Sequence, residues 1–183
     1  MKTRSIISWI LILIVIDQSI KIVINTYFLD YQFDIIPSFM EFKPTFNVKH
    51  SWVNTLINDN FGLNVGLLPH VILYIFIGIF IAAYFSYMRS KIFNNKKLID
   101  ASMIFLYAAL VCALIGNLIW KNGTLDYIYL KPLFVFDLKD IYPDFGIALF
   151  VIYVIKNRVQ LKQPIRTRAV LLYAKDRLKM NKT

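Results

Sequence analysis

The sequence is poor in cysteine, histidine and glycine. Its 183 residues include one cysteine, two histidines and six glycines. The lone Cys112 excludes a disulfide within the chain, and two isolated histidines add no cluster that could bind zinc. Because Cys112 lies in an apolar run, we expect a packed core thiol, and we expect His50 and His70 at the surface. No glycine-rich phosphate loop or internal repeat is present.

Acidic residues are also few, so the chain has an excess of positive charge. The basic residues are unevenly distributed along the sequence. With 11 acidic and 21 basic residues, the formal net charge is +10, which is a level seen in nucleic-acid-binding proteins. Here, however, the basic residues flank apolar stretches. Fifteen of the 21 do so: Lys2 and Arg4, then Arg89, Lys91, Lys96 and Lys97, and finally nine residues from Lys156 to Lys182. This pattern indicates membrane topology and argues against a nucleic-acid partner.

Long apolar stretches dominate the rest of the chain. Hydrophobic residues make up 58% of the sequence, and the mean hydropathy is +0.57. The apolar stretches cover roughly 5–24, 65–88, 98–120 and 141–156, and the first three match the ~20 residues that cross a bilayer. We predict an all-α membrane bundle of four transmembrane helices in residues 1–156, followed by a basic cytoplasmic tail at 157–183.

The positive-inside rule orients this bundle. It places both termini and the 89–97 loop in the cytoplasm, and segments 25–64 and 121–140 outside. Segment 25–64 is rich in aromatic residues and is expected to form a small β-rich unit of short strands, broken by Pro37 and Pro44.

Charged residues within the first apolar stretch indicate a retained helix and not a cleaved signal peptide. Asp17 and Lys21 are four residues apart, so they can form an ion pair on one helix face. Anchoring of the helix at the membrane interface is the simplest role for this pair. A supporting role in a functional site is the alternative.

Two aspartates lie at the ends of apolar stretches on the same predicted side of the membrane. Asp126 follows the third stretch, and Asp140 opens the fourth. A carboxylate at the hydrocarbon edge is costly and usually functional. Two such carboxylates that lie close together would form an aspartic-protease dyad, with one carboxylate charged and the other protonated. Asp137 and Asp144 are expected to be ordinary helix caps.

Five short motifs, in order over roughly residues 9–155, resemble those of the lipoprotein (type II) signal peptidases, a family of four-helix membrane aspartyl proteases. They are Asp17-Gln18-Ser19-Ile20-Lys21, Asn47 to Trp52, Gly116 to Lys121, Thr124-Leu125-Asp126-Tyr127, and Phe136 to Asp140 with Gly146 six residues later. Several positions depart from the family pattern. The second motif lacks its glycine, Trp120 replaces an acidic residue and Lys121 an arginine, and Asp137 and Lys139 replace asparagine and alanine.

The resemblance implies the site and the reaction. Asp126 and Asp140 would be catalytic, while Asp17, Lys21, Asn47 and Asn117 would bind substrate or support the site, with no metal or other cofactor. The substrate would be a prolipoprotein carrying a diacylglyceryl cysteine, cut at the outer interface of the bacterial cytoplasmic membrane by a monomer in contact with lipid. Asp137 would raise the pKa of Asp140 and Lys139 would lower it.

Two alternatives stay open. The altered motifs are compatible with a pseudopeptidase of the same fold that binds lipidated peptides or assists another membrane protein. A small transporter or channel subunit would instead require ionisable residues along the midplane of several spans.

Overall fold

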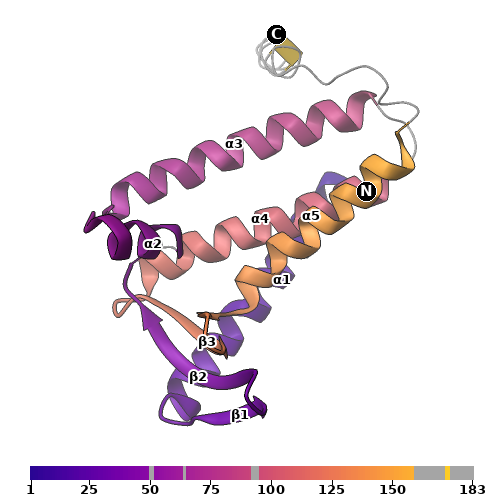
Figure 1. Cartoon of the computed structure of the whole chain (residues 1–183). Helices are drawn as coiled ribbons and strands as arrows, with labels where there is room; N and C mark the ends of the chain where they lie inside the picture. The colour runs from indigo at the N-terminus through magenta and orange to yellow at the C-terminus, as the bar shows by residue number, and fades with distance from the viewer. Residues whose placement is uncertain (50–51, 64, 92–94, 159–171, 174–183) are drawn as a thin grey trace.

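Long helices run side by side, and a small sheet lies at one end of them (Figure 1). The computed structural model describes residues 1–49, 52–63, 65–91, 95–158 and 172–173. The helices are α1 (Thr3–Val23), which continues into a π-helical turn η1 (Ile24–Phe28), α2 (Trp52–Phe61), α3 (Leu67–Lys91), α4 (Lys96–Ile119) and α5 (Leu138–Lys156). The N-terminus and the end of α5 lie away from the sheet.

Among the residues that the structure describes, three helices are long and apolar enough to cross a membrane. They cover Thr3–Phe28, Leu67–Ser90 and Lys96–Ile119. Many of their large apolar side chains point outward, and on α3 both Phe76 and Phe80 are more than half exposed. Such a surface is suited to lipid and not to water. α5 has 19 residues and opens with charged side chains, so its crossing of the membrane stays a prediction.

The sheet is antiparallel with the order β1-β2-β3-β4, and it is larger than the sequence predicts. Its strands are β1 (Phe33–Ile36), β2 (Met40–Asn47), β3 (Thr124–Leu130) and β4 (Phe134–Phe136). The predicted strands within 25–64 are confirmed as β1 and β2. After α4, the alternation of residues 125–128 predicts a strand, which is confirmed as β3, and β4 is a further strand that the sequence does not predict. Pro44 lies where the β2–β3 register shifts, between Phe42 and Thr45, because proline has no N–H to donate to the ladder.

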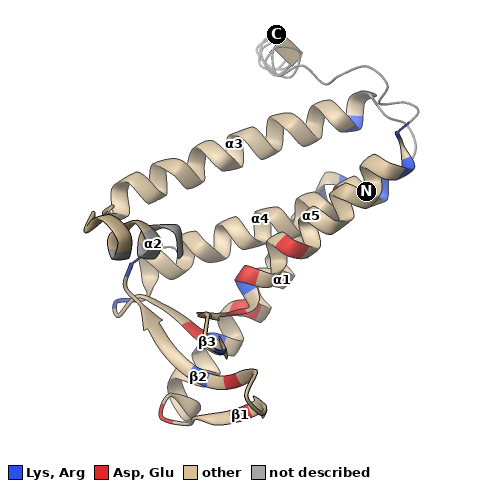
Figure 2. Cartoon of the chain, in the orientation of Figure 1, with Lys and Arg blue, Asp and Glu red and all other residues tan. Residues whose placement is uncertain are grey.

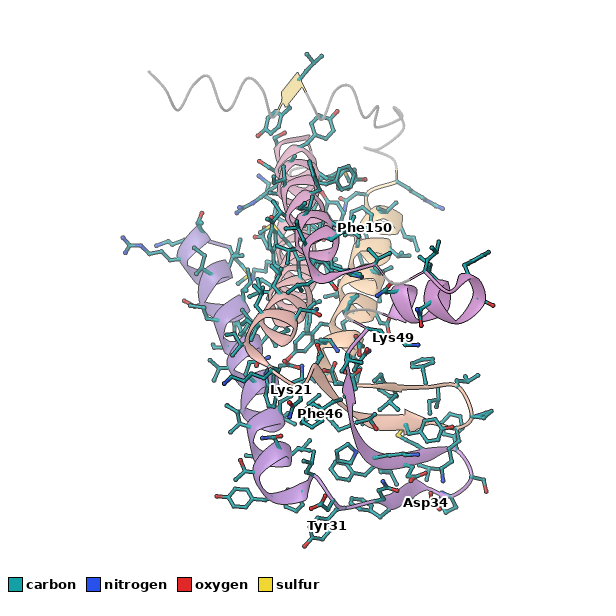
Figure 3. All side chains as sticks on the ribbon, turned by 90° about the vertical axis from the view of Figure 1, so that its left-hand side faces the viewer. Lys21, Tyr31, Asp34, Phe46, Lys49 and Phe150 are labelled. Atoms are coloured by element: carbon teal, nitrogen blue, oxygen red, sulfur yellow. The ribbon has the colours of Figure 1, made fainter. Side chains whose placement is uncertain are left out.

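Apolar packing fixes the sheet against the end of α1. Ile24, Leu125 and Tyr127 form a buried cluster, against which Phe46 and Trp120 pack. Lys21 lies at the level where the helices give way to the sheet, with Phe46 close by (Figure 3). β3 is therefore held next to the C-terminal end of α1.

α4 and α5 approach each other closely at Gly146. The Ser102 hydroxyl donates a hydrogen bond to the Gly146 carbonyl at 2.7 Å. A Cβ added at Gly146 would lie 2.8 Å from Leu106 Cγ and 3.2 Å from the Ser102 carbonyl oxygen. A side chain at this position would push the helices apart, so Gly146 keeps α4 and α5 close together.

We therefore expect Gly146→Ala to lower the free energy of unfolding by about 1–3 kcal/mol, since the added methyl group overpacks the α4–α5 contact. Unfolding in a fixed detergent measures the change. Gly66→Ala is the matched control, because nothing lies within 4 Å of a Cβ at that position. Equal losses in both variants would contradict the packing argument.

Three smaller expectations have different outcomes. Cys112 is fully buried, as predicted for a core thiol. The surface prediction for His70 is wrong, because its ring is buried and its Nδ1 lies 2.9 Å from the Gly66 carbonyl oxygen. His50 and most of the predicted basic tail lie outside the described residues.

Candidate active site

A hairpin brings the two predicted catalytic aspartates together. Ile128 of β3 pairs with Phe136 of β4, so the chain that follows β4 arrives beside Asp126. There Asp137 caps α5 by accepting a hydrogen bond from the backbone N–H of Asp140, and the Asp140 side chain accepts one from the backbone N–H of Asp137. This reciprocal capping box fixes the direction of both side chains. The predicted capping role of Asp137 is confirmed.

Three carboxylates meet at this point. Asp126, Asp137 and Asp140 each contribute an oxygen, and these oxygens all lie within 4.8 Å of one another. Charged residues gather where α1, β3 and the start of α5 meet, whereas most of α3 carries none (Figure 2). Such a set of oxygens could hold a cation. In the structure, the cation among them is a side chain of the protein.

That cation is the ammonium of Lys139, which contacts all three carboxylates. Its Nζ lies 2.9 Å from Asp126 Oδ1, 3.0 Å from Asp137 Oδ2 and 3.2 Å from Asp140 Oδ2. Only 12% of the Lys139 side chain is exposed. The protein thus supplies the positive charge at the centre of its own acidic cluster.

A second lysine links this cluster to α1. Lys21 Nζ lies 3.0 Å from Asp17 Oδ2 and 2.7 Å from Asp137 Oδ2, and all three side chains are fully buried. The predicted Asp17–Lys21 ion pair is therefore confirmed, and it does more than anchor a helix at an interface. It extends the network into an alternating chain of charge: Asp17, Lys21, Asp137, Lys139, and then Asp126 and Asp140.

Trp120 joins the same network from the end of α4. Its indole N–H donates to Gln18 Oε1 at 3.1 Å, and Gln18 Nε2 donates to Asp17 Oδ2 at 2.8 Å. The position that departs from the family motif therefore still braces the first helix, through a neutral hydrogen bond.

The two predicted asparagines lie in different surroundings. Asn47 and Asp126 are on adjacent strands, and Asn47 Nδ2 donates to Asp126 Oδ2 at 3.4 Å. Asn117 donates to the carbonyl of Ala113 in its own helix at 2.8 Å and hydrogen-bonds with Tyr74. The structure thus brings Asn47 to the carboxylates, and it uses Asn117 to connect α4 with α3.

Asp126 and Asp140 line an apolar pocket of about 510 Å³. Asn47, Asp126, Lys139 and Asp140 form its polar part. Side chains of α3 and α4, among them Ile77, Ile81, Leu106 and Leu110, form its apolar part. A ligand in this pocket would place an apolar portion between the helices and a polar group against the acids.

The pKa of each aspartate follows from the balance between burial and the lysines. Partial burial raises the pKa of Asp140, whose side chain is 46% exposed, to about 7, with Asp137 and Asp126 adding to the rise and Lys139 opposing it. Burial also raises the pKa of Asp126, again against Lys139. Burial would raise the pKa of Asp137 too, but Lys139 and Lys21 outweigh it and the pKa falls below its usual value. The opposite effects predicted for Asp137 and Lys139 on Asp140 agree with these causes.

For Lys139, burial favours the neutral amine, but Asp137, Asp126 and Asp140 outweigh it and raise its pKa. The ammonium therefore stays charged across the physiological range.

Lys139 and Asp137 are the site residues that the sequence argument did not select. A signal was present, because both replace neutral residues of the resembled motif, and they do so with opposite charges two positions apart. A compensated pair of charges next to a proposed catalytic acid indicates a contact with that acid.

The fold and this site define a class: helical membrane proteins with clustered carboxylates facing an apolar pocket at one end of the helices. The sequence model of the Peptidase_A8 family, signal peptidase (SPase) II, matches residues 9–156. The chain therefore belongs to the signal peptidase II family, which is a family of aspartic proteases in bacterial membranes. This confirms the predicted resemblance.

Solved structures show the same fold. One bacterial membrane enzyme, determined by the in meso method at 1.9 Å resolution, superposes with a TM-score of 0.65 at 19% identity, covering 85% of this chain and 96% of that one. Another, determined by the same method at 2.3 Å, gives a TM-score of 0.61 at 18% identity, covering 91% of this chain and 96% of that one. No curated protein matches the sequence.

Proposed function

We propose that the chain is an aspartic endopeptidase that removes the signal peptide of prolipoproteins, cutting before the diacylglyceryl-modified cysteine. The observation that carries this proposal is the approach of Asp126 and Asp140 within 4.8 Å, at the polar end of an apolar pocket. A substrate with acyl chains and an apolar signal helix has the same division into apolar and polar parts. Membership in the signal peptidase II family supports it.

In the proposed reaction, the two aspartates have different protonation states. Asp140, whose pKa is raised to about 7, holds the proton and polarises the scissile carbonyl. Asp126 accepts a proton from the attacking water and later passes it to the leaving amine as the C–N bond breaks. The products are a signal peptide with a new carboxylate and a diacylglyceryl cysteine with a free amine.

The remaining predicted site residues have supporting roles in this scheme. Asn47 orients Asp126 through its hydrogen bond, and Asp17 and Lys21 hold Asp137 at the start of α5. Asn117 acts at a distance, by fixing α4 against α3 through Tyr74. None of these roles requires a cofactor.

We also propose the membrane arrangement. The apolar part of α5, from Ile141 onward, would be the fourth span, packed on α4. The positive-inside rule would then place both termini in the cytoplasm and the sheet outside, in the bacterial cytoplasmic membrane. The acids would lie at the outer interface, where a lipid-anchored substrate presents its cleavage site, and a monomer would contain all the residues named.

A catalytically inactive pseudopeptidase is the second candidate, and one observation favours it. The ammonium of Lys139 contacts Asp126 and Asp140 together, at the position where a dyad needs water. On this view the pocket would bind lipidated peptides without cutting them.

Cleavage of a defined substrate tests the two candidates. The purified chain is mixed with a diacylglyceryl-modified prolipoprotein, and the products are identified by mass. Cleavage before the modified cysteine, with the unmodified prolipoprotein left intact as the control, is the expected result. Saturable binding of the modified substrate with no product would support the pseudopeptidase instead.

A further inference from the structure

The Lys139 ammonium donates hydrogen bonds to both proposed catalytic acids, Asp126 and Asp140. An ammonium group has three N–H donors, and three carboxylates lie within 3.2 Å of Lys139 Nζ. Two of them are the proposed catalytic pair, Asp126 and Asp140, so the nitrogen lies between the two acids. Lys139 therefore contacts the two proposed catalytic acids directly.

The net charge of Asp126 and Asp140 also supports a place for the Lys139 ammonium between them. A dyad that shares one proton carries a net charge of −1. Two ionised carboxylates with one ammonium between them also carry −1. Lys139 can thus stabilise Asp126 and Asp140 at close range without the proton that like charges otherwise require.

We propose that the Lys139 ammonium occupies the position between Asp126 and Asp140 that an aspartic dyad gives to its shared proton and water, and that Lys139 thereby sets the pH range in which the pair works. Lys139 is a positioning residue in this scheme, because it acts through the two acids. The position of the ammonium follows from the geometry alone, whereas its effect on the working pH range rests on the proposed function.

The surrounding groups hold the ammonium in place. On α5, Asp137 contacts it and is itself bound by Lys21 of α1, whose other partner is Asp17. On β2, Asn47 bonds the Asp126 oxygen that the ammonium leaves open. On α3, Tyr74 faces Lys139 and Asp140 across the pocket.

The direction of the pH effect follows from Asp140. Above its pKa of about 7, Asp140 is ionised and accepts from the ammonium, so the pair lacks its proton. Below that pH, protonated Asp140 releases the ammonium to Asp126 and Asp137, and water can enter beside Asp140. Cleavage should therefore fall as the pH rises through about 7. Removing Lys139 removes the charge that lowers the pKa of Asp140, so the fall should move to higher pH.

Infrared spectroscopy and cleavage test the two parts of the proposal separately. Lys139→Met keeps the length of the side chain without its charge, and Lys139→Arg keeps a charge. At pH 8 we expect a protonated-carboxyl band in Lys139→Met that is absent from the unaltered chain and from Lys139→Arg, and that is lost again in Lys139→Met/Asp140→Asn. In the cleavage assay, Lys139→Met should be about tenfold faster than the unaltered chain at pH 8, with a much smaller difference at pH 6.

Lys131→Met is the control, because Lys131 pairs with Asp34 and Glu41 at the sheet edge, and its pH profile should match that of the unaltered chain. A protonated-carboxyl band already present in the unaltered chain at pH 8, or identical pH profiles with and without Lys139, would overturn the proposal. If no variant cleaves at any pH, the proposed function fails, and the infrared bands still decide whether Lys139 replaces the proton.

Discussion

Asp126→Asn and Asp140→Asn are each expected to lower kcat/KM for prolipoprotein cleavage by about 10²–10⁴-fold, the range that a general acid or base contributes. Asparagine has nearly the same shape as aspartate, but it can neither accept a proton from water nor lend one to the carbonyl. Each substitution also removes one negative charge from a cluster of three carboxylates. The expected loss is therefore one of chemistry and not of folding, and steady-state cleavage below pH 7 measures it.

Two controls separate chemistry from folding. Thermal unfolding of both variants in the same detergent should match that of the unaltered chain. Asp34→Asn removes an acid that is 47% exposed on β1 and far from the pocket lining, so it should leave cleavage unchanged. If either site variant keeps full cleavage, that aspartate does not belong to the catalytic pair.

Much of the fold follows from sequence patterns that are contained within a single element. The three spans appear where apolar residues run for about 20 positions, because length and hydropathy alone satisfy the bilayer. The alternation in Leu125-Asp126-Tyr127-Ile128 likewise predicts strand structure, and β3 covers Thr124–Leu130. In each case the signal and the element lie in the same residues.

The remaining parts depend on contacts between distant residues. α2 was not predicted, since its stability includes a buried side chain, Asn54, that bonds the carbonyls of Lys49 and Val65 on either side of the helix. Asp126 and Asp140 come together because β3 pairs with β4 in a particular register, and no local sequence pattern predicts that register. The sequence predicts Asp137 as a cap that raises the pKa of Asp140, but it does not predict the contact with Lys21, which lies more than 100 positions earlier in the chain.

Lys21→Met is expected to cause the largest loss of stability, about 3–5 kcal/mol, the usual cost of removing one partner from a buried ion pair. Lys21 and both of its partners, Asp17 and Asp137, are fully buried. Methionine fills most of the volume but leaves Asp17 without its ammonium partner. Asp137 keeps its contact with Lys139 and loses the shorter one of 2.7 Å. Chemical unfolding in a fixed detergent reports the change, and Lys131→Met, at an exposed ion pair, should cause little loss.

A double variant shows whether the loss comes from uncompensated charge. Asp17→Asn/Lys21→Met removes both members of the α1 pair, so it should be more stable than Lys21→Met alone, although each substitution deletes a contact. If the double variant instead lost as much stability as the two single variants together, Asp17 and Lys21 would stabilise the fold independently of each other, through packing alone. Recovery of stability without recovery of cleavage would show that Lys21 is needed to hold Asp137, and through it Lys139, beside the catalytic acids.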